Sequence, residues 1–153
     1  MTAADPNAPR APLPAAVPPC LVAELDVLAA RWHAAMAGAG LANAPDTAAA
    51  ATLAVFAKSP FVAEFAIRRP ADFAALVADS APRSRADHDR EVAAALAGAA
   101  DQAAAKSALR RLRQAAMTRI AWRDIHRGVA VDTIMHELSD FADAVVAGAV
   151  AWL

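Results

Sequence analysis

The longest hydrophobic pattern in the chain runs from residue 106 to residue 127. Leu109, Leu112, Ala116 and Ile120 recur there at spacings of three and four, which places them on one face of a helix. Because the stretch contains no Gly or Pro, nothing interrupts that helix. The pattern therefore predicts one long continuous helix.

A second pattern follows after the short link of residues 128–130. Its apolar positions repeat at alternating spacings of four and three, as in a heptad: Ile134, Leu138, Phe141, Val145, Gly148 and Trp152. The repeat predicts a helix with a seam suited to helix packing, and Asp132 is expected to cap it. Two long helices joined by so short a link predict an antiparallel hairpin, around which the rest of the chain packs.

Shorter helices are predicted ahead of this hairpin, from residues 21–38, 46–58, 59–69, 70–78 and 84–96. Ser59, Ser84 and Asp101 are expected to cap the helices that follow them, with Asp87 completing a capping box at Ser84. Leu21, Leu25, Leu28 and Trp32 form the expected buried stripe of the first helix. In the third helix Phe61 and Phe65 are expected to face inward, and in the fourth Phe73 belongs to an apolar face.

Composition supports an all-α helical bundle. The chain is rich in alanine and contains only five Gly and no Tyr, which favours helices over strands. Residues 1–19 hold more than half of the ten prolines and are predicted to be a disordered leader. Residues 20–153 are predicted to form one helical domain.

The two long helices carry opposite net charges. The first is basic and contains a single acid, Asp124; its cations are Lys106, Arg110, Arg111, Arg113, Arg119, Arg123 and Arg127. The second has no Lys or Arg and is acidic through Asp132, Glu137, Asp140 and Asp143. Two interpretations of the basic helix follow.

In the first interpretation, Arg119, Arg123 and Arg127 stack at intervals of four and could present their guanidinium groups to an anion or to a partner. In the second, which we favour, the basic side chains pair internally with the acids of the neighbouring helix. Under that interpretation Trp122 and Phe141 should be buried, and Arg123 should be held by a carboxylate.

Three stretches of the sequence also resemble a known family. They are LRRLRQAAMTRIAWRDI (109–125), SPFVAEFAIRRP (59–70) and LSDFADAVVAGAVAWL (138–153). In this order they resemble the helices ahead of the first catalytic domain of the bacterial glutamine synthetase adenylyltransferase/adenylyl-removing enzyme. The resemblance covers roughly residues 53–153.

The resemblance implies a function in nitrogen regulation. In that family one catalytic domain removes AMP from a tyrosine of glutamine synthetase by phosphorolysis, and a second attaches AMP from ATP. The resemblance also implies that the full-length enzyme uses Mg²⁺ and ATP. Its implied partners are glutamine synthetase and a nitrogen-signalling regulatory protein. The chain is then expected to be a truncated portion of a nucleotidyltransferase; the alternative is a freestanding helical interaction module. A Gly-Ser pair and an Asp-x-Asp encoded downstream of Leu153 would distinguish the two.

Catalytic groups are not evident in the sequence. The family's Gly-Ser pair is missing, because each of the five glycines precedes Ala, Leu or Val. Asp87 and Asp89 form an Asp-x-Asp, but on a helix their side chains diverge and cannot share a metal ion. His136 and Asp140 lie one turn apart without a third ligand, so we predict no catalytic or metal site and no cofactor bound by this chain.

Net charge, hydropathy and cysteine content exclude some further classes of protein. The net charge of −1 argues against a general nucleic-acid binder, and the longest apolar run, residues 144–153, is too short to span a membrane. The single Cys20 is compatible with a reducing compartment. We therefore expect a cytoplasmic protein with no membrane or nucleic-acid partner.

Overall fold

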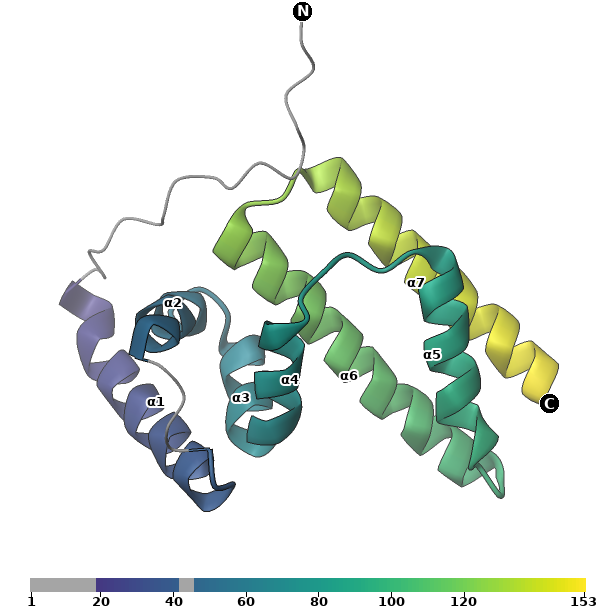
Figure 1. The fold of residues 1–153 in the computed structure, drawn as a ribbon, viewed down its shortest axis with the longest axis horizontal. Coiled ribbons are helices and arrows are strands. Elements are labelled where there is room, and N and C mark those ends of the chain that lie inside the picture. Colours follow the sequence, from purple (N-terminus) through teal and green to yellow (C-terminus); the bar gives the residue numbers. More distant parts are fainter. Residues whose placement is uncertain (1–18, 42–45) are drawn as a thin grey trace, which may run out of the picture.

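The computed structural model describes residues 19–41 and 46–153, so all of the predicted leader except its last residue lies outside the described residues. The described residues form seven helices and no strand (Figure 1). The helices are α1 (Pro19–Gly38), α2 (Asp46–Phe56), α3 (Pro60–Arg68), α4 (Pro70–Ala78), α5 (Arg85–Ala97), α6 (Gln102–Arg127) and α7 (Val131–Trp152). The all-α prediction is confirmed, and Pro19, expected in the leader, begins α1 instead.

Local hydrogen bonds set the starts of three helices as predicted. The Ser59 hydroxyl accepts a hydrogen bond from the backbone N–H of Val62 at 3.3 Å. Ser84 and Asp87 form the expected capping box at the start of α5. The carboxylate of Asp101 accepts from the backbone N–H of the third residue of α6 at 2.7 Å. Each cap satisfies a backbone donor that the helix itself leaves free.

The predicted cap of α7 is wrong. The helix begins at Val131, its N-cap residue is Ala130, and no side chain caps it. Asp132 lies within the first turn instead, where a negative charge still complements the helix dipole. The preceding link turns at Gly128, whose φ of 59° is in the left-handed region that favours glycine.

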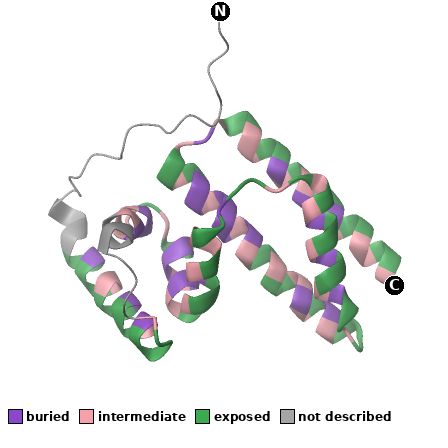
Figure 2. Cartoon of the chain, in the orientation of Figure 1, coloured by how far each residue is buried: buried purple, intermediate pink, exposed green. Residues whose placement is uncertain are grey.

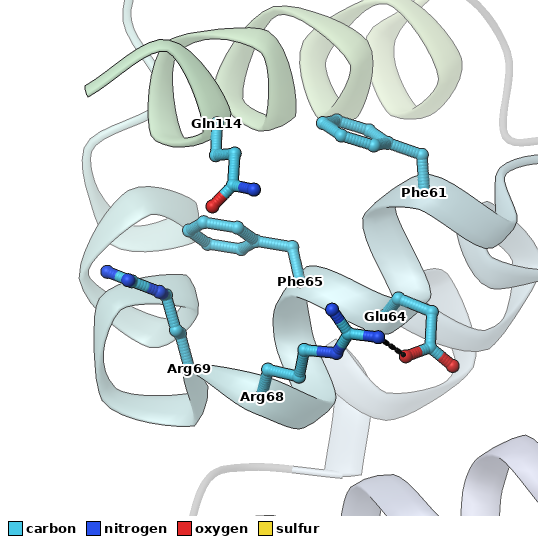
Figure 3. Close-up of a pocket in the computed structure, with 6 residues that line it drawn as sticks. All are labelled: Phe61, Glu64, Phe65, Arg68, Arg69 and Gln114. Atoms are coloured by element: carbon cyan, nitrogen blue, oxygen red, sulfur yellow. Dashed lines mark ion pairs between the residues drawn. The ribbon is translucent and has the colours of Figure 1, made fainter. Parts of the chain in front are cut away.

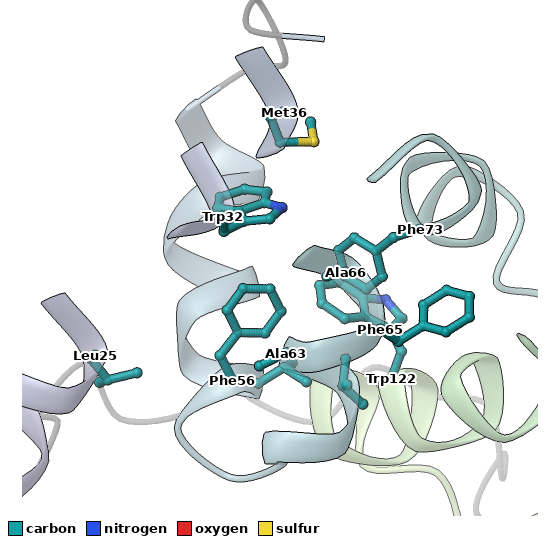
Figure 4. Close-up of a cluster of buried hydrophobic side chains, with 11 residues drawn as sticks. Leu25, Trp32, Met36, Phe56, Ala63, Phe65, Ala66, Phe73 and Trp122 are labelled. Atoms are coloured by element: carbon teal, nitrogen blue, oxygen red, sulfur yellow. The ribbon is translucent and has the colours of Figure 1, made fainter. Parts of the chain in front are cut away.

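The larger hydrophobic core joins α1–α4 to the C-terminal half of α6 (Figure 4). Trp122 of α6 packs edge-on against Phe73 of α4, with ring centroids 5.4 Å apart. Phe56 of α2 contacts Phe73 and also meets Trp32 of α1 edge-on. The expectation for Phe61 is wrong, because its side chain is 47% exposed.

A second, smaller core lies between α5, α6 and α7. Its buried members are Val92, Leu96, Ala105 and Ala144. The backbones of α5 and α7 approach closely here: a Cβ atom added to Gly148 would lie 2.3 Å from Cγ1 of Val92. Small residues on α7 thus permit close packing on α5.

These contacts revise the expected arrangement of the two long helices. They run in opposite directions after their short link (Figure 1), but they contact each other less extensively than either contacts α5. The helix α7 therefore packs mainly on α5, and not on α6 as its heptad-like seam suggested. The burial pattern places α6 in both cores, since Trp122 belongs to the first and Ala105 to the second (Figure 2).

Candidate functional site

Charged side chains are buried where α5, α6 and α7 meet. Arg119 and Arg123 of α6 are 7% and 1% exposed, and Glu137 of α7 is 4% exposed. Nη2 of Arg123 donates to Oε2 of Glu137, and Nε of Arg119 lies 4.0 Å from Oε1 of the same carboxylate. Glu137 thus faces both arginines of α6.

A second carboxylate and a loop arginine extend this group. Oε1 of Glu91, on α5, accepts from Nη1 of Arg119 at 3.2 Å and from Nε of Arg83 at 3.4 Å. The backbone N–H of Arg83 donates to Oε1 of Glu137 at 3.3 Å. Arg83, in the loop between α4 and α5, therefore ties the buried Glu137 and the half-buried Glu91 to that loop.

At its exposed end the group continues to Asp79. Arg83 donates two hydrogen bonds to the Asp79 carboxylate, the shorter at 2.5 Å. These bonds lower the pKa of Asp79 and, from the other side, raise the pKa of Arg83. The pair is thus fully ionised at neutral pH.

We call these six residues the ionic cluster: Asp79, Arg83, Glu91, Arg119, Arg123 and Glu137. It contains three cations and three carboxylates, so its formal charge is zero. A buried guanidinium is costly unless a carboxylate compensates it, and here each arginine has one. The cluster is therefore balanced without an external anion.

Some polar atoms of this region have no hydrogen-bond partner among the described residues. They are Nε and Nη2 of Arg119, Nε and Nη1 of Arg123, Oε2 of Glu91, and both ring nitrogens of His88. Buried donors without partners are costly. The arginines are therefore held mainly by charge, with few of their donors used.

His88 lies at the edge of the ionic cluster and is fully buried. Its ring meets Phe141 of α7 edge-on at 5.3 Å. Its Nδ1 atom is 3.4 Å from Oε2 of Glu91. His88 thus contributes packing between α5 and α7 beside the half-buried carboxylate of Glu91.

The three stacked arginines lie in different environments. Arg119 and Arg123 point to internal carboxylates, whereas Arg127 is exposed on the last turn of α6. The three guanidinium groups do not share one surface. Trp122 and Phe141 are buried and Arg123 is held by a carboxylate, as the internal-pairing interpretation predicted.

That interpretation was wrong about the other acids of α7. Asp143 is 3.5 Å from Arg85 of α5, and it does not reach α6. Arg85 also pairs with Asp89, which raises the pKa of the guanidinium. Among the acids of α7, only Glu137 forms an ion pair with α6. Its position on the buried face, one turn before Phe141, is the sequence signal that distinguishes it.

Sequence reasoning missed Glu91 and Arg83. Both belong to α5 or the loop before it, and they reach the cluster only because α5 packs against α6 and α7. Their positions in the sequence carry no local signal of this role. The pairing is a product of tertiary structure.

The other chemical candidates remain separate. Asp87 is used in the capping box, where the Ser84 hydroxyl lowers the pKa of the carboxyl group, while Asp89 pairs with Arg85. Nδ1 of His136 faces the backbone oxygen of Asp132 at 2.6 Å. Within residues 19–41 and 46–153 no three His, Cys, Asp or Glu side chains converge as a metal site would require.

A small pocket lies between α3 and α6, about 110 Å³ in volume. Phe65 and Gln114 face each other across it, with Phe61 at one side (Figure 3). Its two arginines already have partners: Arg68 pairs with Glu64 at 3.3 Å, and Arg69 pairs with an aspartate of α4 at the same distance. The pocket offers an aromatic wall and an amide but no free charge.

Comparison with known proteins decides the family. The family model for glutamate-ammonia ligase adenylyltransferase matches residues 49–153. The chain belongs to this family. The matched range contains α3–α7, the smaller core and the whole ionic cluster, whereas Leu25, Trp32 and Met36 of the larger core lie ahead of it.

The similar curated proteins are bifunctional glutamine synthetase adenylyltransferase/adenylyl-removing enzymes. The one from Thioalkalivibrio sulfidiphilus is 35% identical over 144 residues, which is 92% of this chain and 14% of the relative. Those from Shewanella oneidensis and Shewanella loihica are each 34% identical, over 74% and 65% of this chain and 12% and 10% of the relatives. The chain thus spans about one seventh of the length of its first relative.

No solved structure matches the chain significantly. In the described part of the chain, every helix is too short or too polar to cross a bilayer.

Proposed function

We propose that this chain is a helical, non-catalytic portion of a glutamine synthetase adenylyltransferase/adenylyl-removing enzyme and has neither activity alone. The observation that carries the proposal is the family match over residues 49–153. The sequence contains no Gly-Ser pair, and its single Asp-x-Asp has its carboxylates committed to a helix cap and to Arg85.

The chain's contribution to such an enzyme is structural. The ionic cluster fixes α5, α6 and α7 relative to one another through charges that would be costly to separate. Because α6 also packs in the core of α1–α4, it holds those helices in a fixed position relative to α5 and α7.

In the full-length enzyme the substrate protein is glutamine synthetase, and a nitrogen-signalling protein regulates the reaction. ATP and Mg²⁺ are used at the catalytic domains, and no residue of this chain is assigned to hold them. The single cysteine is compatible with the cytoplasm as the site of action.

The test uses the purified chain and both forms of glutamine synthetase. With adenylylated glutamine synthetase and phosphate, the chain should form no ADP. With the unmodified protein, ATP and Mg²⁺, it should transfer no adenylyl group. A full-length enzyme of the family serves as the positive control, and phosphate-dependent ADP formation by the chain alone would contradict the proposal.

A freestanding interaction module is the second candidate. The observation that favours it is the exposed apolar surface of α7, where Val146 and Val150 are 64% and 69% exposed. Large exposed apolar side chains in one patch are typical of interaction surfaces.

A further inference from the structure

An apolar stripe runs along the whole of α7 and includes most of its exposed large apolar side chains. Its members follow one another at intervals of three and four: Val131, Met135, Leu138, Ala142, Val146 and Val150. Four of these, Val131, Met135, Val146 and Val150, are more than half exposed. A helix that packs on one face only normally presents polar residues elsewhere, so this stripe lacks a partner in the described structure.

The stripe forms one wall of a groove between α6 and α7, about 480 Å³ in volume. Leu109 and Met117 line it from α6, and Leu138 and Val145 line it from α7. Two nearly antiparallel helices with an apolar groove between them offer the geometry that accepts a third helix. An extended strand would leave its backbone groups unpaired against these apolar walls.

The α6 edge of this groove is strongly basic. Arg110 and Arg113 line the groove, and Lys106 lies on the same face of α6, one turn earlier. All three are exposed, and none of them forms an ion pair with an acid among residues 19–41 and 46–153. This edge contrasts with Arg119 and Arg123, whose charges are compensated internally.

From this combination we infer that the α6–α7 groove binds an amphipathic helix of another polypeptide segment, with apolar residues on one face and acidic residues along one flank. The apolar face covers the stripe, and the acidic flank pairs with Arg110 and Arg113. Electrostatic complementarity of this kind selects the partner and its orientation.

A second copy of the chain fits the groove less well. It would bring another apolar stripe, but three of the four acids of α7 are committed elsewhere: Glu137 is buried, and Asp140 and Asp143 lie near Arg85. Two copies packed through their stripes would therefore offer each basic edge at most Asp132 as an acidic partner. An acidic helix satisfies the apolar stripe and the charges together.

The experiment uses two synthetic helical peptides of about three heptads with identical leucine faces. One carries glutamate on the flank and the other carries lysine, and fluorescence anisotropy measures the binding of each to the purified chain at low salt. The glutamate peptide should bind about tenfold more tightly or better.

Three variants assign that preference to the groove. The double variant Arg110→Glu/Arg113→Glu should bind the lysine peptide more tightly than the glutamate peptide. Arg111→Glu changes an exposed residue of α6 outside the groove and should leave the preference for the glutamate peptide unchanged. Val146→Glu should weaken the binding of both peptides, because it places a charge on the apolar wall of the groove. Circular dichroism confirms that each variant is folded.

Three results would overturn the inference. The peptides could bind equally, or fail to bind, or the charge reversal could leave the preference unchanged. Self-association of the chain that Val146→Glu abolishes, together with the absence of peptide binding, would assign the groove to a second copy and also overturn it.

Discussion

Replacing Glu137 by leucine should destabilise the fold more than any other removal of a single charge. Glu137 is 4% exposed, and its carboxylate faces Arg123, Arg119 and the backbone N–H of Arg83. Without it, Arg123, which is 1% exposed, has no carboxylate. Its guanidinium would then be a buried, uncompensated charge.

The size of the loss follows from this burial. Breaking a buried ion pair by removing one partner costs about 3–5 kcal/mol, a large share of the roughly 5–15 kcal/mol that stabilises a domain. Replacing both partners removes the stranded charge. The double variant Arg123→Met/Glu137→Leu should therefore lose only about 1–2 kcal/mol, mostly from the hydrogen bond donated by Arg83.

Urea unfolding, followed by circular dichroism at 222 nm, measures the four corners of this double-mutant cycle. Asp143→Leu is the matched control, because Asp143 is also an acid of α7 in an ion pair but its side chain is 73% exposed. It should change the free energy of unfolding by at most about 0.5 kcal/mol. Equal losses for Glu137→Leu and Asp143→Leu would refute the reasoning.

Three further predictions use the same unfolding measurement. Trp122→Ala should lower the free energy of unfolding by about 3–5 kcal/mol, because it removes a large side chain from the larger core. Arg110→Ala, at an exposed site, should lower it by less than about 0.5 kcal/mol. Equal losses for the two variants would contradict the central position of α6. Gly148→Ala should cost about 1–3 kcal/mol by forcing α7 away from α5, while Gly98→Ala, where an added Cβ meets nothing within 4 Å, should be nearly neutral or stabilising. The lowered pKa of Asp87 means that its cap stabilises the native state fully above its ordinary pKa of 3.8 and loses that effect as the pH falls through the lowered value. Asp87→Asn should therefore be less stable than the wild type at pH 7, and the difference should shrink as the pH falls below 3.8; a stability difference that does not change with pH would contradict this.

Features set by neighbouring residues were predictable from the sequence. Ser59, Ser84 and Asp101 cap helices because a short polar side chain can reach a backbone N–H two or three residues ahead. The alanine-rich composition predicted the all-α fold for the same local reason. Asp132 shows the limit of this reasoning, because the helix starts one residue before it.

Features set by tertiary packing were not predictable. Gly148 permits α7 to approach α5 closely, so α5 becomes its main partner although α6 precedes α7 in the chain. The same packing brings Glu91 to Arg119 and places Arg83 between two carboxylates. The interpretation of internal pairing predicted a carboxylate for Arg123, but charge patterning alone did not separate Glu137 from Asp143.

The central claim is that this chain serves as the helical scaffold of a glutamine synthetase adenylyltransferase/adenylyl-removing enzyme. A chimera tests it most directly: residues 49–153 replace the matching segment of the Thioalkalivibrio sulfidiphilus relative. The account predicts that the chimera retains the adenylyltransferase and adenylyl-removing activities, whereas the same chimera carrying Glu137→Leu shows lower thermal stability. A chimera that folds but has neither activity would contradict the account.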